Sequence, residues 1–454
     1  QRPPGPPTRW FGLSKIGEIQ RDLIGFYQRL QGDYGDAVFM QIGPYQDYSF
    51  FHPDQIHEVL IEKAKAFVRF KRPLDVLKQW NGDGVLITEG EKWLSHRRLL
   101  QPAFSVKRFG GYADAVVATA STQFSQAAPQ ETTLDFEAAM TDLTTSVICR
   151  TMFGSDLGDR MPDMRRAVQI LSKVAVEEMF QPFTWPDWLP LPGKAEKKWA
   201  INLIDQTVRG FIRQRRDSGG DTGDLLSMLL LAADEEGDGR RLTDEQARDQ
   251  CVTIFLAGHD TTAAGLAWLG WVLATHPDYT ERLAADIISV LGDRPPTFAD
   301  LPKLAAVERA VKESLRLYPP AIAVFARQAV KDVEIGGWTV PRGGVVRLMT
   351  YITHHDPRWF PDPETFDPDR FLPERWAALP PCAYVPFGAG PRVCLGQSFA
   401  MMEMTLIATL LLQRYRITPA QTKPELNPSM SLRPIGGMRV KLTPRTSMSG
   451  VNSP

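Results

Sequence analysis

One cysteine lies in a glycine-rich segment just ahead of a predicted helix. Residues 387–396 read FGAGPRVCLG, with Cys394 in the eighth position, and an apolar helix is predicted over 397–412. Backbone N–H groups of the turn and of the helix N-terminus favour a thiolate. A single thiolate in a shielded pocket can be the axial ligand of haem iron, and glycines let the backbone approach a flat macrocycle. A buried structural cysteine is the ordinary alternative for a lone Cys.

A second segment places an acid next to an alcohol inside a long predicted helix. Residues 257–262 read AGHDTT; the helix begins at a capping box of Thr243 and Gln246 and meets no proline before Pro277. Such a helix has about 32 residues and is nearly 50 Å long, enough to span the molecule. Gly and Thr are poor mid-helix residues, so we expect a local distortion there. A capping or surface role for the acid and alcohol is the alternative, but the neighbouring residues are apolar.

Two further pairs have spacings that suit charged partners. Glu313 and Arg316 share one face of a helix predicted over 306–317 and can form a charge-assisted pair. Trp93 and Arg97, four apart on an earlier helix, carry N–H groups that suit carboxylates. Taken alone, each pair is also compatible with an ordinary solvated helix.

The composition is that of an ordinary globular protein. Of 454 residues, 43% are hydrophobic and 23% charged, which excludes intrinsic disorder and a small disulfide-stapled fold. Fifty-two basic and 53 acidic side chains give a net charge of -1, which argues against nucleic acid as a partner. The four cysteines form no CxxC pair, which indicates a reducing compartment. The longest apolar run, 263–274, is too short to cross a bilayer, so we expect a soluble, cytoplasmic protein with no membrane span in this chain.

The elements that must position these residues are mainly helical. An N-terminal helix over 15–31 precedes two strands, at 38–42 and 47–51, that predict a small sheet. Length alone allows about three domains, but no repeat or linker divides the chain, so we predict one domain over 1–454. Its predicted parts are a small-sheet region at about 33–75, a helical core at about 89–320, the Cys-ligand loop 387–396 and a frayed tail at about 447–454.

Residues 387–396 resemble the haem-binding signature of the cytochrome P-450 superfamily, and the resemblance extends over almost the whole chain. Residues 313–316, ESLR, resemble its ExxR element, residues 257–262 its oxygen-activating motif, and Trp93 with Arg97 its WxxxR. Ten positions of agreement favour the ligand interpretation of Cys394 over the structural one. The resemblance implies a mainly α cytochrome P-450 fold of the soluble, bacterial type, with small β-sheets and a long central helix.

The resemblance also implies roles for individual residues. Cys394 is expected to bind the iron of haem b (iron protoporphyrin IX), Thr261 to orient oxygen and water, and Asp260 to relay protons. The expected buried structural network consists of Glu313, Arg316 and Arg370. The other expected cofactor contacts, including the propionate partners, are Trp93, Arg97, Ala257, Arg327, Phe387, Arg392 and Gly396. The expected substrate-cavity residues are Leu86, Ala321, Ile322, Ala323 and Val324.

The histidines are expected to have no metal-binding role. His259 is predicted to be packed or hydrogen-bonded within its helix rather than an iron ligand. His354 and His355 are adjacent in sequence, so their side chains project apart and do not suit a shared non-haem iron or zinc site.

The implied function is a haem-thiolate monooxygenase that inserts one oxygen atom from dioxygen into an apolar small molecule. No flavin or ferredoxin module is encoded, so electrons from NAD(P)H are expected through a separate ferredoxin or flavodoxin-type reductase chain. A peroxide-driven peroxygenase is one alternative, against which the intact Asp260-Thr261 pair argues; a non-catalytic haem gas sensor or ligand-binding protein is another. Terpenoids, steroids and fatty acids stay open as substrates, although residues 43–51, with Gln46 and Asp47 but no Lys or Arg, make a fatty acid the weaker candidate.

Overall fold

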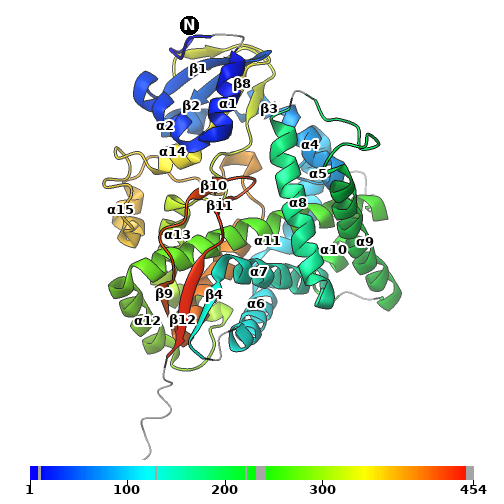
Figure 1. Ribbon diagram of the computed structural model, residues 1–454, viewed down its shortest axis with the longest axis vertical. Coiled ribbons are helices and arrows are strands. Elements are labelled where there is room, and N and C mark those ends of the chain that lie inside the picture. The colour runs from blue at the N-terminus through cyan, green and yellow to red at the C-terminus, as the bar shows by residue number, and fades with distance from the viewer. Residues whose placement is uncertain (9–11, 128–129, 182, 220–221, 232–241, 446–454) are drawn as a thin grey trace, which may run out of the picture.

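The computed structural model describes residues 1–8, 12–127, 130–181, 183–219, 222–231 and 242–445, and it is mainly helical (Figure 1). The tail predicted to fray at 447–454 lies outside these residues. The α-helices are α1 (Leu13–Arg21), α2 (Leu23–Tyr34), α3 (Pro53–His57), α4 (Lys71–Asn81), α5 (Gly90–Leu100), α6 (Val106–Ala127), α7 (Phe136–Phe153), α8 (Met161–Met179), α9 (Lys194–Ser218), α10 (Leu225–Leu231), α11 (Asp244–Thr275), α12 (Pro277–Leu291), α13 (Ala305–Leu317), α14 (Thr350–His354), α15 (Pro373–Ala377) and α16 (Gln397–Arg414). The strands are β1 (Ala37–Ile42), β2 (Tyr45–Phe50), β3 (Phe67–Arg69), β4 (Thr132–Asp135), β5 (Arg327–Ala329), β6 (Val333–Ile335), β7 (Trp338–Val340), β8 (Val345–Leu348), β9 (Tyr415–Pro419), β10 (Leu426–Pro428), β11 (Leu432–Pro434) and β12 (Arg439–Pro444).

The N-terminal sheet lies at one end of the molecule, above the helical body in Figure 1. Its strand order is β1-β2-β8-β5-β3; β2 and β8 are parallel, with Asp47 opposite Val345, and the other neighbours are antiparallel. Strands β1 and β2 are the two predicted at 38–42 and 47–51. Asp47 is buried and accepts a 2.6 Å hydrogen bond from Arg347 on β8. Asp47 is therefore a sheet-internal ion-pair partner and does not line the cavity described below.

The first predicted helix, over 15–31, is in fact two helices. Asp22 separates α1 from α2 with a non-helical backbone (φ −151°), and its carboxylate accepts a 2.9 Å hydrogen bond from the Gly25 amide. An Asp at this position caps the following helix by satisfying an amide that has no intrahelical partner. The hydrophobic spacing continued across the break, which is why periodicity alone did not reveal it.

The long central helix is α11, and it has the predicted length of 32 residues. The Thr243 side chain and the Gln246 side chain form the predicted capping box at its start. In Figure 1 the helix runs through the body, and most of its side chains are buried. A Cβ at Gly270 would lie 2.2 Å from Phe136 Cε1, so this glycine allows close packing of α7 against α11.

The expected distortion in the middle of α11 does not interrupt the helix, which is continuous from Asp244 to Thr275. The Thr261 hydroxyl does donate to the Ala257 carbonyl one turn back, at 2.9 Å, as its residue type allows. The existing backbone hydrogen bonds tolerate this extra donor without a break in the helix.

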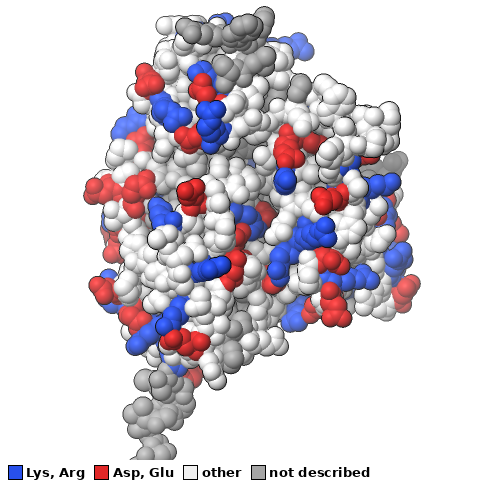
Figure 2. Space-filling model, viewed as in Figure 1, with Lys and Arg blue, Asp and Glu red and all other residues white. Residues whose placement is uncertain are grey.

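The strands of the C-terminal region form two small sheets, one of which also includes β4. Strands β4, β12 and β9 form an antiparallel sheet, and β10 and β11 form a hairpin. The hairpin is held against α11 because Trp268 Nε1 donates to the Leu432 carbonyl at 2.8 Å, while the Leu432 amide donates to the Pro320 carbonyl at 2.8 Å. Figure 2 shows acidic and basic side chains interspersed over the face in view, in keeping with the near-zero net charge. Within the described ranges, every helix is too short or too polar to cross a bilayer.

Candidate active site

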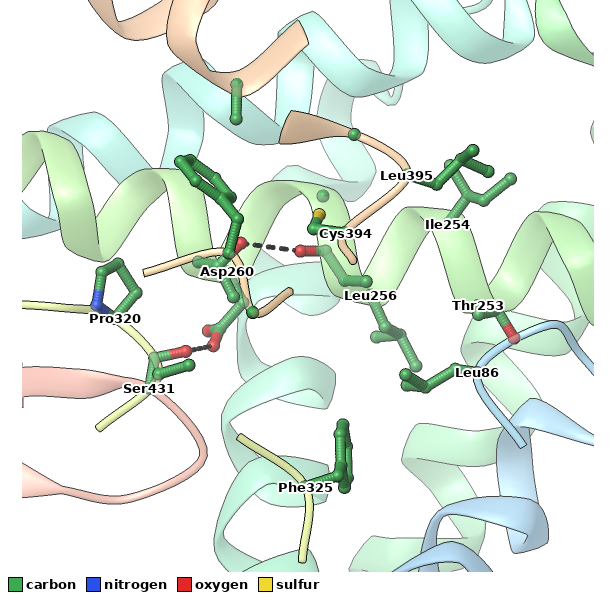
Figure 3. A pocket seen from close by; sticks show the side chains of 18 of the residues that line it. Leu86, Thr253, Ile254, Leu256, Asp260, Pro320, Phe325, Cys394, Leu395 and Ser431 are labelled. Atoms are coloured by element: carbon green, nitrogen blue, oxygen red, sulfur yellow. Dashed lines mark hydrogen bonds between the residues drawn. The ribbon is translucent and has the colours of Figure 1, made fainter. Parts of the chain in front are cut away.

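A cavity of about 450 Å³ separates α11 from the loop that carries Cys394 (Figure 3). Its wall is built from residues of α4, α5, α7, α8, α11, α13 and α16, of the strands β3 and β5, of the loops that follow α4 and α13, of the cysteine loop and of the β10–β11 hairpin. Most lining side chains are apolar. Segments that lie between residues 69 and 431 therefore meet around one cavity.

The predicted substrate-cavity residues lie on this wall, with one exception. Leu86, Ala321, Ala323 and Val324 line the cavity. Ile322 does not: it packs in the main apolar core, because neighbouring residues of a loop project in different directions. The role of Ile322 as a substrate contact therefore stays a prediction that this placement does not support. Lining residues without any sequence signal include Leu77, Trp80, Val168, Leu171, Ala175 and Met430.

The Cys394 thiol faces the cavity instead of packing in the core. The Cys394 amide donates to the Phe387 carbonyl at 3.0 Å, which closes the glycine-rich turn. Gly390 has φ +70°, and a Cβ there would lie 1.9 Å from the Leu60 carbonyl oxygen, so the turn requires glycine. Burial raises the pKa of the Cys394 thiol, and this outweighs the Gly396 amide and the Arg97 charge that act to lower it. The turn alone therefore does not produce the thiolate that its N–H groups were expected to favour.

Four arginines, Arg69, Arg97, Arg327 and Arg392, line the cavity. In the described chain, the carboxylate paired with this cluster is Glu89, which accepts from Arg69 Nε at 2.6 Å and from Arg392 Nη2. Burial, reinforced by the positive charge of Arg69, lowers the pKa of Arg392 to about 9 and that of Arg327 to about 10. The cluster holds more positive charge than its protein partners balance, and it suits a bound anion.

Arg69 was not predicted, because it lies on β3, far from every motif in the sequence. Its guanidinium also donates to the Thr88 carbonyl at 2.6 Å and to the Leu86 carbonyl. Arg97 Nη1 donates to the Val393 carbonyl at 3.0 Å, which ties α5 to the cysteine loop. Trp93, Ala257, Phe387 and Gly396, the other predicted cofactor contacts, also line the cavity.

Glu313 and Arg316 form a fully buried pair outside the cavity lining. Arg316 Nε and Nη2 donate to the two Glu313 carboxylate oxygens at 2.8 Å each, and neither side chain is exposed to solvent. Arg370 Nε donates to Glu313 Oε1 at 3.3 Å. Arg316 also donates to the His354 carbonyl at 2.9 Å. The network therefore joins α13 to α14 and to the segment around Arg370.

Asp260 and Thr261 lie on α11 and line the cavity, but the Asp260 carboxylate is already engaged. Its Oδ1 accepts from Arg433 Nη2 at 2.6 Å. Its Oδ2 accepts from the Ser431 hydroxyl, a contact drawn in Figure 3. Burial acts to raise the pKa of Asp260, but the charge of Arg433 and the hydrogen bonds from Ser431 and Arg433 hold it below its ordinary value. Ser431 and Arg433 stand 171 and 173 residues further along the chain, so no local sequence signal pointed to them.

His259, His354 and His355, the three histidines discussed from the sequence, are all buried. His259 is buried, and its Nδ1 lies 2.7 Å from the Phe255 carbonyl. His354 and His355 are buried and bond to backbone groups: the Val385 amide donates to His354 Nε2 at 3.0 Å, and His355 Nδ1 lies 2.8 Å from the Tyr351 carbonyl. The described residues contain no cluster of three His, Cys, Asp or Glu side chains able to hold a metal ion.

The family model described as Cytochrome P450 matches residues 3–442. The chain belongs to the cytochrome P450 family. Human Cytochrome P450 4F3 is 34% identical over 97% of this P450 and 90% of its own length, and mouse Leukotriene-B4 omega-hydroxylase 3 is 32% identical over 97% and 89%. Cyclooctat-9-en-7-ol 5-monooxygenase of Streptomyces melanosporofaciens is 35% identical over 85% of this P450 and 83% of its own length.

Solved structures have the same fold as this P450. The heme domain of cytochrome P450DA superposes with a TM-score of 0.88 at 25% identity, covering 98% of each chain. Retinoic acid bound cyanobacterial CYP120A1 gives a TM-score of 0.85 at 24% identity, covering 98% of this P450 and 99% of that chain. The predicted mainly α P450 fold is thereby confirmed, and the protein is an oxidoreductase of a family that uses haem and dioxygen.

The residues of this P450 fit haem. A thiol facing the cavity suits an axial iron ligand, and the arginine cluster, with its incompletely balanced positive charge, suits two propionate carboxylates. The largely apolar wall suits the faces of the macrocycle.

Proposed function

We propose that this P450 is a monooxygenase that inserts one atom of dioxygen into a neutral, apolar small molecule, with electrons from a separate redox protein. The observation that carries the proposal is the Cys394 thiol facing a largely apolar cavity. The reaction balances as RH + O₂ + 2H⁺ + 2e⁻ → ROH + H₂O. The residues around the cavity must therefore hold the substrate, exclude bulk water and deliver two protons.

When bound, haem supplies the thiolate-ligated iron at which dioxygen is activated. We assign Cys394 as the iron ligand and the arginine cluster, with Trp93, as the propionate site. Thr261 is assigned to orient oxygen and water through its hydroxyl, and Asp260 to carry protons from the hairpin side of α11 toward that hydroxyl. Glu313, Arg316 and Arg370 are assigned a structural role, in which they join α13 to α14 and to the segment around Arg370.

The distribution of charge on the cavity wall favours a neutral substrate. Every Lys or Arg on the described wall belongs to the arginine cluster, which the propionates would occupy. No cation of the wall is then left to pair with a fatty-acid carboxylate, and burying an unpaired carboxylate is costly. The names of the relatives include both chemistries, leukotriene B4 and cyclooctat-9-en-7-ol. Of these two compounds, the charge distribution on the cavity wall favours the neutral alcohol cyclooctat-9-en-7-ol as the model for the substrate.

The substrate class can be tested by spectral titration of the purified haem protein. We expect cyclooctat-9-en-7-ol to shift the Soret band at lower concentration than leukotriene B4 does. Tighter binding of leukotriene B4 would contradict the neutral-substrate assignment. Products from the tighter ligand are then measured with NADPH, a surrogate ferredoxin and its reductase.

The same assay separates the alternative functions. A monooxygenase consumes NADPH and dioxygen and forms a hydroxylated product. A peroxygenase forms product faster with hydrogen peroxide alone than with NADPH and the surrogate chain. A sensor binds ligand but forms no product under either condition, and that result would overturn the proposed function.

A further inference from the structure

Arg433 links two carboxylates that come from different helices. Its Nη2 donates to Asp260 Oδ1 on α11 at 2.6 Å, and its Nη1 donates to Glu137 Oε1 on α7. The three side chains are largely buried, with exposed fractions of 20% for Arg433, 16% for Glu137 and 12% for Asp260. An ion pair this sheltered is weakly screened by salt, so its geometry restricts the Asp260 carboxylate strongly.

The hairpin that carries Arg433 also forms part of the cavity wall. Met430 and Ser431 line the cavity, and the Ser431 hydroxyl donates to the second oxygen of Asp260. Figure 3 shows Ser431 meeting Asp260 from the hairpin side. A molecule that presses on Met430 or Ser431 therefore pushes on the same short segment that holds both Asp260 oxygens.

In this arrangement neither the acid nor the alcohol is ready to transfer a proton. Asp260 is held by two donors, and the Thr261 hydroxyl donates to the Ala257 carbonyl at 2.9 Å. A carboxylate paired with a guanidinium is a weak base and takes up a proton poorly. To carry a proton from water to Thr261, the Asp260 carboxylate must first leave Arg433.

We propose that Arg433 is a positioning residue that holds Asp260 in a resting position on the β10–β11 hairpin, and that substrate contact with Met430 and Ser431 releases Asp260 for proton transfer. This inference rests on the proposed function, because it presumes the relay role of Asp260. The proton passes from water to the Asp260 carboxylate and on toward the Thr261 hydroxyl, with no net change in either residue. The electrons come from NADPH through the redox partner.

The alternative is that the ion pair only anchors the hairpin. Trp268 offers a matched control, because its indole N–H donates to the Leu432 carbonyl of the same hairpin without touching Asp260. Trp268→Phe therefore weakens the hairpin anchor and leaves the Asp260 pair in place. Arg433→Gln removes the guanidinium, Arg433→Lys keeps a positive charge, and the double variant Arg433→Gln/Asp260→Asn removes the proposed relay as well.

The experiment uses haem-loaded protein with NADPH, a surrogate ferredoxin and its reductase, and no added substrate. The readouts are NADPH consumption, its solvent isotope effect in deuterium oxide, haem content from the reduced carbon monoxide spectrum, and the thermal midpoint. We expect Arg433→Gln to raise substrate-free NADPH consumption at least threefold and to lower the isotope effect. Arg433→Lys should restore wild-type values, and the double variant should lose the increase.

The outcomes separate this inference from the function on which it rests. If Arg433→Gln and Trp268→Phe lower the thermal midpoint alike and neither changes consumption or the isotope effect, Arg433 is only an anchor. A rise in substrate-free NADPH consumption that persists in the double variant also overturns the inference, because the effect of Arg433 on consumption cannot then act through Asp260. If Asp260→Asn alone leaves turnover and the isotope effect at wild-type values, Asp260 is not a proton relay. That result contradicts the proposed function itself, and the inference about Arg433 then has no basis. If Arg433→Gln loses its haem, Ser431→Ala replaces it, because this change frees the other Asp260 oxygen. Its NADPH consumption and isotope effect are compared with those of the wild type in the same way.

Discussion

Arg392 stacks on Trp93, with its guanidinium carbon 3.8 Å from the centre of the Trp93 rings. The contact joins the cysteine loop to α5, and it fixes Arg392 beside the other arginines of the cluster. A cation over an aromatic face contributes about 0.5 to 2 kcal/mol, with the larger values at sheltered sites. The indole of Trp93 therefore helps to keep like charges close together in a cavity that is suited to an anion.

Replacement of Trp93 by Ala should weaken haem binding roughly 3- to 30-fold, because the stacking energy that orders Arg392 is lost. Trp93→Phe, which keeps an aromatic face, should lose less. Haem transfer to apomyoglobin measures the effect. Trp376→Ala is the control, since Lys312 lies 6.0 Å from the centre of that exposed ring and neither residue lines the cavity. Equal haem loss from both Ala variants would contradict the assigned role.

Cys394→Ser should abolish the red-shifted Soret band of the reduced carbon monoxide complex. A serine hydroxyl cannot replace the thiolate as a strong electron donor to iron. Cys382→Ser is the matched control, because Cys382 is a free cysteine that does not line the cavity. Retention of the red-shifted band in Cys394→Ser would remove this residue as the ligand.

Glu313→Ala or Arg316→Ala should lower folding stability by about 3 to 5 kcal/mol and reduce haem retention, because each leaves a buried charge without its partner. The same helix offers a control in Lys312→Ala, which breaks a partly exposed pair with Glu308 at 2.8 Å. That change should cost no more than about 0.5 kcal/mol. Urea unfolding and haem content measure both. Haem-loaded Glu313→Ala of normal stability would show that the network is not structural.

Thr261→Ala should still bind substrate and accept electrons, but it should release more of them as hydrogen peroxide, because the hydroxyl that guides the second proton is gone. Asp260→Asn should slow proton-dependent turnover by about 10²-fold. Thr275→Ala is the control, since its hydroxyl makes the same 2.9 Å bond to a carbonyl one turn back in α11. Product and peroxide per NADPH are measured in all three. Wild-type coupling in Thr261→Ala would favour the peroxygenase alternative.

Acid should destabilise the fold through buried, neutral histidines. Burial lowers the pKa of His355 to about 4, below its unfolded value near 6.5. Between pH 6.5 and 4 the unfolded chain therefore binds more protons at this position, and stability falls as the pH falls. His355→Phe keeps the stack on Tyr351 but cannot titrate. It should reduce the slope of unfolding free energy against pH by up to about 1.4 kcal/mol per pH unit. An unchanged slope in urea titrations would place the acid sensitivity elsewhere.

The sequence by itself determined those features whose signals are local. The glycine-rich turn around Cys394, the capping box at Thr243 and the spacing of Glu313 and Arg316 each depend on residues within about ten positions of one another. Helical periodicity and turn chemistry act over the same short range, so the long central helix and the small sheet were also predicted. The break at Asp22 was missed because the hydrophobic spacing continues through it.

Only the tertiary structure decided which distant groups meet. Arg69 enters the arginine cluster from β3, and Arg433 reaches Asp260 from a hairpin 173 residues further along the chain. Ile322 turned out to face the core, although its neighbours face the cavity. These outcomes depend on how helices and loops pack, and packing is a property of the whole core that no window of sequence contains. The burial and pairing of Asp260 arise in the same way, because its partners and its desolvation both come from chain remote in sequence.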